Sequence, residues 1–278
     1  THISFIHNRI REITSPSIFD YKRWPFELIQ NAVDCFHDEK GEHLINNGTI
    51  TFDFNDNNVT FTHNGCPFSN NNLISLLYQY GGGKEGTRSI GRFGTGFLST
   101  LILSRIVHVS SDLFDNDTQE ISGFEVTIDR NGENREELKK GIKRMEDSKK
   151  MNLPVKGKTE FIFNLPSDFK EKSNGKAYEE GIKSLKSNIP QSMIFNPSIK
   201  SIILRTKDET LTYSRISDQN EHIKTIKVQS STKGIFQRSF IYVETKSLFE
   251  YTFTSKKEIT KNVLINCIIE IGENKNII

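Results

Sequence analysis

The chain lacks the features that mark several common classes of protein. It has three cysteines in 278 residues and no Cys-x-x-Cys pair, which disfavours a zinc site or a disulfide scaffold and favours a reducing cytoplasm. No run of about 18 apolar residues occurs, so we expect no membrane span. The net charge of +2 indicates neither nucleic acid nor a membrane as a partner. We expect no signal peptide, and the first residue, Thr1, suggests a fragment of a longer protein.

The stretch RWPFELIQNAVDCF, residues 23–36, predicts a helix that is apolar on most sides. Pro25 fits the first turn, where its missing N–H costs nothing. Glu27, Asn31 and Asp34 share one face because they lie at i, i+4 and i+7. Carboxylates on an otherwise buried face need a partner or a purpose, although a solvated helix edge would give the same pattern. An amide oxygen one turn after a glutamate is also a suitable ligand for Mg²⁺.

Residues 46–65 predict a β-hairpin with one buried face. Apolar residues alternate with polar ones on both sides of an Asp-Asn-Asn turn: Ile50, Phe52 and Phe54 before it, Val59 and Phe61 after it. His63 continues this alternation. We therefore expect its side chain to point inward.

Residues 81–96 read GGGKEGTRSIGRFGTG, with seven glycines in sixteen positions. The spacing Gly91-x-x-Gly94-x-Gly96 lets backbone N–H groups approach an anion where a helix begins, although a flexible loop would show the same glycines. A helix predicted over 70–80 precedes this segment, where a Rossmann fingerprint needs a strand. No GxxxxGK[ST] sequence occurs either, which excludes a Walker A loop.

The rest of the chain alternates between strands and charged helices. We expect strands near 105–110, 121–128 and 159–165, and an exposed helix or flap over the charged residues 134–150. A further helix is expected over 176–188, and the sequence is strand-rich from 197 onward. A composition change near 167–175 suggests a domain boundary there.

Four motifs in this order resemble those of the GHKL ATPases. ELIQNAVD (27–34) resembles the N-box of that family, and HNGCPF (63–68) occupies the place of its first glycine box. IGRFGTGF (90–97) resembles the second glycine box, and GKT (157–159) stands at its Gly-Thr strand. The likeness covers residues 20–166 and is strongest to the sacsin-like and heat-shock-chaperone-like branch.

The resemblance implies a fold and a domain organisation. The fold would be α+β: a Bergerat-type two-layer sandwich with a mixed, largely antiparallel sheet and helices on one face. The ATP-binding domain would span residues 1–168 with an N-terminal extension, and a smaller strand-rich, transducer-like region would span 169–278. We also expect further domains or partner proteins, and a homodimer formed through the N-terminal residues.

The resemblance also implies roles for the matching residues. Glu27 corresponds to the general base that activates water, and Asn31 to the Mg²⁺ ligand. The other matches are nucleotide contacts: Asp34, His63, Gly65, Gly91, Gly94, Thr95, Gly96, Phe97 and Thr159. Lys84 and Arg88, in the glycine-rich flap, are candidates for contact with the γ-phosphate.

Two positions depart from the family pattern. His63 stands where the family has an aspartate that accepts a hydrogen bond from the adenine amino group. A neutral imidazole can accept or donate, so adenine selectivity is in question, and a buried histidine without any ligand contact remains an alternative. Lys158 stands where glycine is commonest, one residue after Gly157.

The sequence thus predicts a cytoplasmic Mg-ATP-binding module that hydrolyses ATP slowly and acts as a conformational switch, in a chaperone-like or anti-phage defence protein. The first alternative is a nucleotide-binding scaffold without turnover. A second alternative, a nucleic-acid clamp, rests on the basic stretches 139–150 and 170–186, but acidic residues interrupt both.

Overall fold

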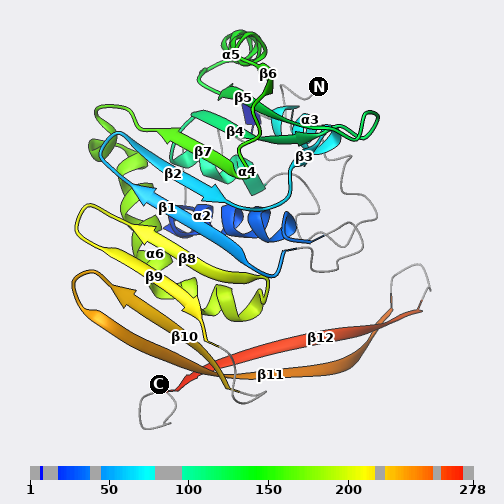
Figure 1. Cartoon of the computed structure of the whole chain (residues 1–278), viewed down its shortest axis with the longest axis vertical. Helices are drawn as coiled ribbons and strands as arrows, with labels where there is room; N and C mark the ends of the chain where they lie inside the picture. Colours follow the sequence, from blue (N-terminus) through cyan, green and yellow to red (C-terminus); the bar gives the residue numbers. More distant parts are fainter. Residues whose placement is uncertain are drawn as a thin grey trace.

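The protein folds as a mixed α+β structure around one large, mostly antiparallel sheet (Figure 1). The computed structural model describes residues 7–8, 18–37, 45–78, 96–216, 223–252 and 258–271. Within these residues, twelve strands form the sheet, in the order β12-β11-β10-β9-β8-β1-β2-β7-β4-β5-β6, with β3 paired to β4. The expected α+β class with a largely antiparallel sheet is confirmed.

The elements of the described residues have the following bounds. The helices are α2 (Ile18–Asp34), α3 (Asn70–Tyr78), α4 (Gly96–Ser99), α5 (Arg135–Asp147) and α6 (Ser173–Phe195), with short 3-10 helices η2 (Thr100–Ile102) and η3 (Phe169–Glu171). The strands are β1 (Gly48–Phe54), β2 (Asn58–His63), β3 (Phe68–Ser69), β4 (Ile106–Phe114), β5 (Ile121–Asp129), β6 (Lys150–Leu153), β7 (Thr159–Asn164), β8 (Ile199–Arg205), β9 (Thr210–Arg215), β10 (Ile223–Ser230), β11 (Gly234–Thr252) and β12 (Glu258–Ile271).

Strands β1 and β2 form the hairpin that the alternation of residues 46–65 predicts. They pair antiparallel, with Phe54 opposite Val59 and Phe52 opposite Phe61. Every second residue of each strand is buried. His63 falls on the buried side, with 3% of its surface exposed, which confirms the prediction that its side chain points inward.

Helix α2 begins earlier than the sequence predicts. It starts at Ile18, so Pro25 lies inside the helix and not in its first turn. Proline removes one backbone hydrogen bond from a helix interior. The buried residues Trp24, Leu28 and Ile29 around Pro25 compensate for this loss, because tertiary packing supplies most of the stability of a protein helix.

Helices α2 and α6 lie side by side behind the central strands (Figure 1). The indole N–H of Trp24 donates to the carbonyl of Ala177, with 2.9 Å between nitrogen and oxygen. A Cβ at Gly181 would come within 2.7 Å of the Trp24 ring. Glycine at this position therefore allows the two helices to approach closely.

The sheet continues past the predicted domain boundary. After α6 the chain returns as β8, which pairs parallel with β1, so that Ile50 lies opposite Ile202. Strands β9 to β12 extend the sheet from there, and β11 and β12 form a long two-stranded ribbon at its edge (Figure 1). The division of the chain at residue 168 into two domains stays a prediction.

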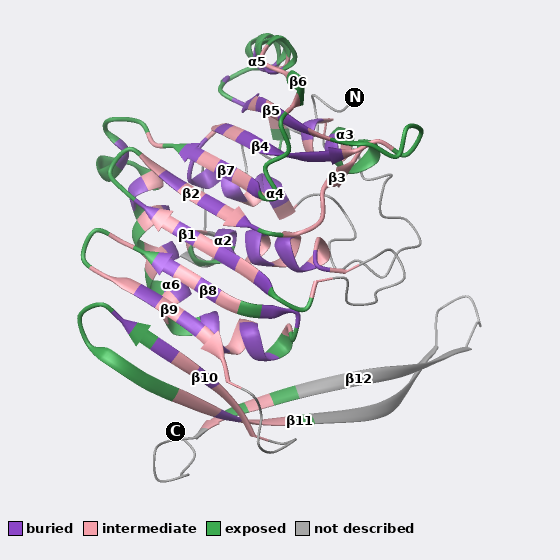
Figure 2. Ribbon diagram, in the orientation of Figure 1, coloured by how far each residue is buried: buried purple, intermediate pink, exposed green. Residues whose placement is uncertain are grey.

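The core lies between the central strands and the helices behind them (Figure 2). Most of the largest fully buried side chains are aromatic, among them Trp24, Phe36, Phe52, Phe61 and Phe163. Burying one such side chain contributes roughly 1.5–3 kcal/mol. The aromatic core thus fixes α2, with its stripe of Glu27, Asn31 and Asp34, against β2, which ends at His63, and β7, which begins at Thr159.

Other expectations are confirmed with small corrections. Helix α3 begins at Asn70, within the range predicted as helix, and the Ser69 hydroxyl caps it by accepting from the amide of Asn72. The charged stretch 134–150 forms helix α5, capped by the Asn134 side chain. Strand β6 follows it and was not predicted. The sequence also suggests a short helix over residues 5–14, and these residues lie mostly outside the described ones.

Candidate functional site

The polar stripe of α2 is placed as its spacing predicts. Glu27, Asn31 and Asp34 are each half-buried, whereas Leu28 and Val33, on the other sides of the helix, are buried. The stripe therefore lies at the margin of the core, where side chains can contact both protein and a ligand.

The Glu27 carboxylate is held from two directions. Arg23, one turn earlier, contacts Oε1 with both Nε (2.7 Å) and a terminal nitrogen (2.6 Å). Oε2 lies against Gly96, the first residue of α4, where a Cβ would collide with it. The glycine at position 96 thus leaves room for the carboxylate.

Burial and one hydrogen bond determine the protonation state of the His63 ring. Its ring lies edge-on to Phe36, with 6.2 Å between ring centres, and 5.8 Å from the ring of Phe61. Nδ1 accepts a hydrogen bond from the backbone N–H of Gly65, at 3.1 Å. Burial lowers the pKa of His63 to about 4, because an apolar environment disfavours the charged ring.

Gly65 occupies a crowded turn after β2. A Cβ there would come within 2.6 Å of the Cys35 Cβ and 2.8 Å of the His63 Nδ1. The amide of Cys66 also donates to the carbonyl of Cys35, at 3.0 Å. This glycine therefore lets the first glycine motif approach the end of α2.

Thr159 lies directly opposite His63 in the pairing of β2 with β7. It is buried, and its hydroxyl lies 2.6 Å from that of Ser111 in β4. The turn before it contains Gly157, with a φ of +68°. Lys158 pairs with Glu160 at 3.0 Å. Gly157, one residue before the position where the family has its glycine, thus forms the turn. Lys158 is exposed, whereas Thr159 is buried.

The second glycine motif is described only at its end. Gly96 contacts Glu27, and Phe97 is buried with its ring 5.7 Å from that of Phe161. Lys84, Arg88, Gly91, Gly94 and Thr95 lie outside the described residues. The predicted contacts of these five residues with the phosphates stay predictions.

Sequence reasoning missed two residues of this site. The i, i+4 spacing of Arg23 and Glu27 is a signal that could have revealed their ion pair. Ser111, the partner of Thr159, could not have been found in this way, because cross-strand pairing joins segments 48 residues apart.

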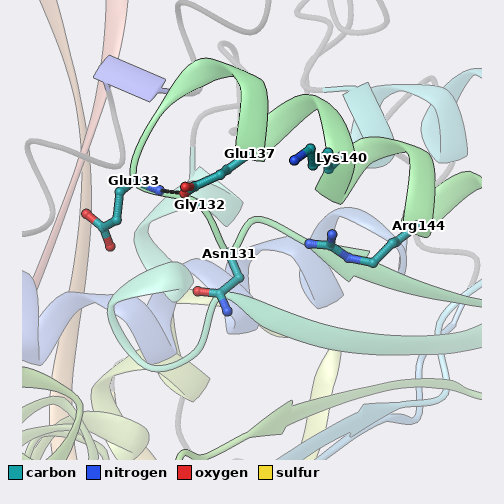
Figure 3. A pocket seen from close by; sticks show the side chains of 6 residues that line it. All are labelled: Asn131, Gly132, Glu133, Glu137, Lys140 and Arg144. Carbon is teal, nitrogen blue, oxygen red and sulfur yellow. Dashed lines mark hydrogen bonds between the residues drawn. The ribbon is translucent and has the colours of Figure 1, made fainter.

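A separate open hollow of about 190 Å³ lies at the start of α5 (Figure 3). Several polar groups at this helix start are already engaged by other protein groups. The Asn134 side chain accepts from the amides of Glu136 and Glu137, and the Glu137 carboxylate accepts from the amide of Glu133. Arg144 pairs with Asp129 at 2.7 Å. The amides of Glu133, Glu136 and Glu137 are therefore not left for an anion.

The part of the chain that the structure describes contains neither a cluster of metal-ligating side chains nor a membrane-spanning helix. No three His, Cys, Asp or Glu side chains are grouped there to hold a metal ion by themselves. No helix there combines the length and apolarity that a membrane span requires. A scan against protein-family models found no matching family, and a search of curated proteins found no match.

Proposed function

We propose that this chain binds a Mg²⁺–nucleoside triphosphate in a Bergerat-type site and hydrolyses it slowly, as part of a conformational switch. The observation that carries this proposal is the convergence of motif residues from separate segments. Gly96 lies against Glu27, Gly65 lies against His63 and the end of α2, and Thr159 lies opposite His63. The first contact joins the second glycine motif to the N-box-like motif, and the third joins the Gly-Thr strand to the first glycine motif. Gly65 also brings the first glycine motif against Cys35, the residue that follows the N-box-like motif.

Each residue has a role that suits its chemistry. Glu27 is the general base for the attacking water, acting through Oε2, since Arg23 engages Oε1. Mg²⁺ usually keeps several waters and takes one or two protein oxygens together with phosphate oxygens. The amide oxygen of Asn31 therefore fits a cation that arrives with the nucleotide. When bound, Mg²⁺ would neutralise charge on the phosphates.

The second candidate is a nucleotide-binding scaffold without turnover. It is favoured by the ion pair of Glu27 with Arg23, which engages Oε1. A water that approached Oε1 would need to displace Arg23 before Glu27 could activate it. Both candidates use the same binding site and differ in the chemical step.

The test is Mg²⁺-dependent binding and hydrolysis of ATP, ITP and GTP by the wild type, Glu27→Ala and Asn31→Ala. We expect slow turnover in the wild type, turnover lost with binding kept in Glu27→Ala, and Mg²⁺-dependent binding weakened in Asn31→Ala. Lys22→Ala is the control, because Lys22 is exposed on the opposite side of α2. Binding without turnover in any variant favours the scaffold, and no binding of any nucleotide overturns both candidates.

A further inference from the structure

The hydrogen-bonding polarity of His63 is fixed by its neighbours. A ring nitrogen that accepts a hydrogen bond carries no proton, and Nδ1 accepts from the Gly65 N–H at 3.1 Å. In a neutral imidazole the single proton is then on Nε2. The tautomer is thus assigned from the hydrogen bond, and Nε2 is a donor.

The surroundings of His63 keep the ring neutral and suit the nucleobase of a nucleotide better than its phosphates. The ring is 3% exposed and packs against Phe36 and Phe61. A phosphate charge placed among these rings would lose its hydration without gaining a cation. The charged part of the candidate site, Glu27 with Arg23, is on α2 beside Gly96.

The hydroxyl groups beside His63 are compatible with Nε2 acting as a hydrogen-bond donor to a ligand. Thr159 is its cross-strand neighbour, and the Thr159 and Ser111 hydroxyls lie 2.6 Å apart. A hydroxyl can donate or accept, so this pair adapts to either face of a base. His63, unlike these two hydroxyls, has a hydrogen-bonding direction that is fixed by its neighbour Gly65.

We propose that His63 reads position 6 of a purine through its Nε2–H, so that the site prefers a 6-oxo purine, hypoxanthine or guanine, over adenine. This inference rests on the proposed function, since it assumes that a nucleotide occupies the site. A carbonyl at position 6 accepts from Nε2–H, whereas the amino group of adenine presents a second donor. A site that hydrogen-bonds one such group discriminates strongly against the mismatched one, because the buried partner is left unpaired.

The test compares equilibrium binding of MgITP, MgGTP and MgATP to the wild-type chain by calorimetry. ITP differs from ATP only at positions 6 and 1 of the purine, so this pair isolates the group in question. We expect ITP to bind about tenfold more tightly than ATP, or better. GTP shows whether the 2-amino group is also tolerated, and tight binding of GTP supports the same preference.

Variants provide the second part of the test. His63→Asp replaces the donor by an acceptor and should shift the ITP-to-ATP affinity ratio toward ATP by about tenfold or more. His63→Gln places an amide near the same position and should bring the ratio close to one, since an amide can present either group. His108→Asp is the control, because it puts a carboxylate on a half-buried strand position in β4 and should leave the ratio unchanged.

The outcomes separate this inference from the proposed function. If nucleotides bind and ATP equals or exceeds ITP in the wild type, the inference is wrong and the nucleotide site stands. An ITP preference that persists unchanged in both His63 variants also overturns it, because another group would then select the base. If no purine nucleotide binds, both proposals fail.

Discussion

At the scale of single residues, the burial of His63 makes the free energy of unfolding depend on pH. The pKa of His63 is about 4 in the folded chain, whereas an unburied histidine, as in the unfolded chain, has a pKa of 6.5. Between these values the unfolded chain binds a proton that the folded chain does not. Stability present above pH 6.5 is therefore lost as the pH falls toward 4.

We predict that this loss distinguishes the wild type from His63→Gln, which has no group to titrate at this position. Between about pH 7.5 and pH 5, the wild type should lose about 2 kcal/mol more unfolding free energy than the variant. Urea unfolding at both pH values measures the difference. Equal losses would show that the imidazole accepts a proton in the folded chain.

Gly96 is a second residue with a defined steric role. Alanine there would place a methyl group on Oε2 of Glu27, and the carboxylate is the movable end of its side chain. The Arg23 side chain that holds it is 69% exposed, so shifting this pair costs little stability. We therefore predict that Gly96→Ala changes unfolding free energy by less than about 1 kcal/mol but displaces the proposed base.

Turnover is the sensitive measurement for Gly96→Ala. Misplacing a catalytic group lowers kcat by about tenfold or more, so hydrolysis should fall while nucleotide binding remains. The double variant Glu27→Ala/Gly96→Ala should be no slower than Glu27→Ala alone, since the colliding group is then absent. Full turnover in Gly96→Ala would argue against Glu27 as the base.

At the scale of elements, the contact of α2 with α6 depends on one glycine. The Trp24 ring near Gly181 is buried, and it packs 6.1 Å from Phe54 and 6.4 Å from Phe163, measured between ring centres. The ring is therefore confined and cannot yield to a methyl group at position 181 without disturbing the core.

We predict that Gly181→Ala destabilises the protein by about 1–3 kcal/mol, as overpacking of a core does. The intrinsic helix preference for alanine over glycine, about 1 kcal/mol, acts in the opposite direction. Ser187→Ala, at an exposed position of the same helix, is the control and should change stability by a few tenths of a kcal/mol. A stabilised Gly181→Ala in urea unfolding would show that the helices can separate freely.

The elements that could be predicted from the sequence are those with a strong local pattern. The alternation through Phe52, Phe54 and Phe61 predicted the hairpin and its buried face, and the charged stretch 134–150 predicted α5. The start of α2 was wrong, because Pro25 was read as a boundary and the packing around it could not be seen. Strand β6 was missed because most of it is exposed and has no apolar alternation.

The same distinction holds for the candidate site. The stripe of Glu27, Asn31 and Asp34 follows from helical periodicity, which is local. The pairing of β1 with β8 and the contact between Thr159 and Ser111 join distant segments, and no local pattern encodes them. The tautomer of His63 depends on the turn at Gly65, which only the folded backbone defines.

At the scale of the whole molecule, the candidate site exists only in the folded chain. Its described residues come from α2, the ends of β2 and β7, and the start of α4, more than 130 residues apart at the extremes. A ligand that binds there binds the native state and not the unfolded chain. Binding must therefore shift the folding equilibrium of the entire sheet that contains β2 and β7.

We predict that Mg²⁺ with a purine nucleoside triphosphate raises the unfolding temperature in a concentration-dependent way. At a ligand concentration of one hundred times Kd, the gain in stability is about 2.7 kcal/mol. Differential scanning calorimetry measures it, with Glu27→Ala keeping the shift and Asn31→Ala losing much of its Mg²⁺-dependent part. A shift of equal size in the absence of Mg²⁺ would contradict the role of Asn31, because the nucleotide would then bind without the cation that its amide is proposed to hold.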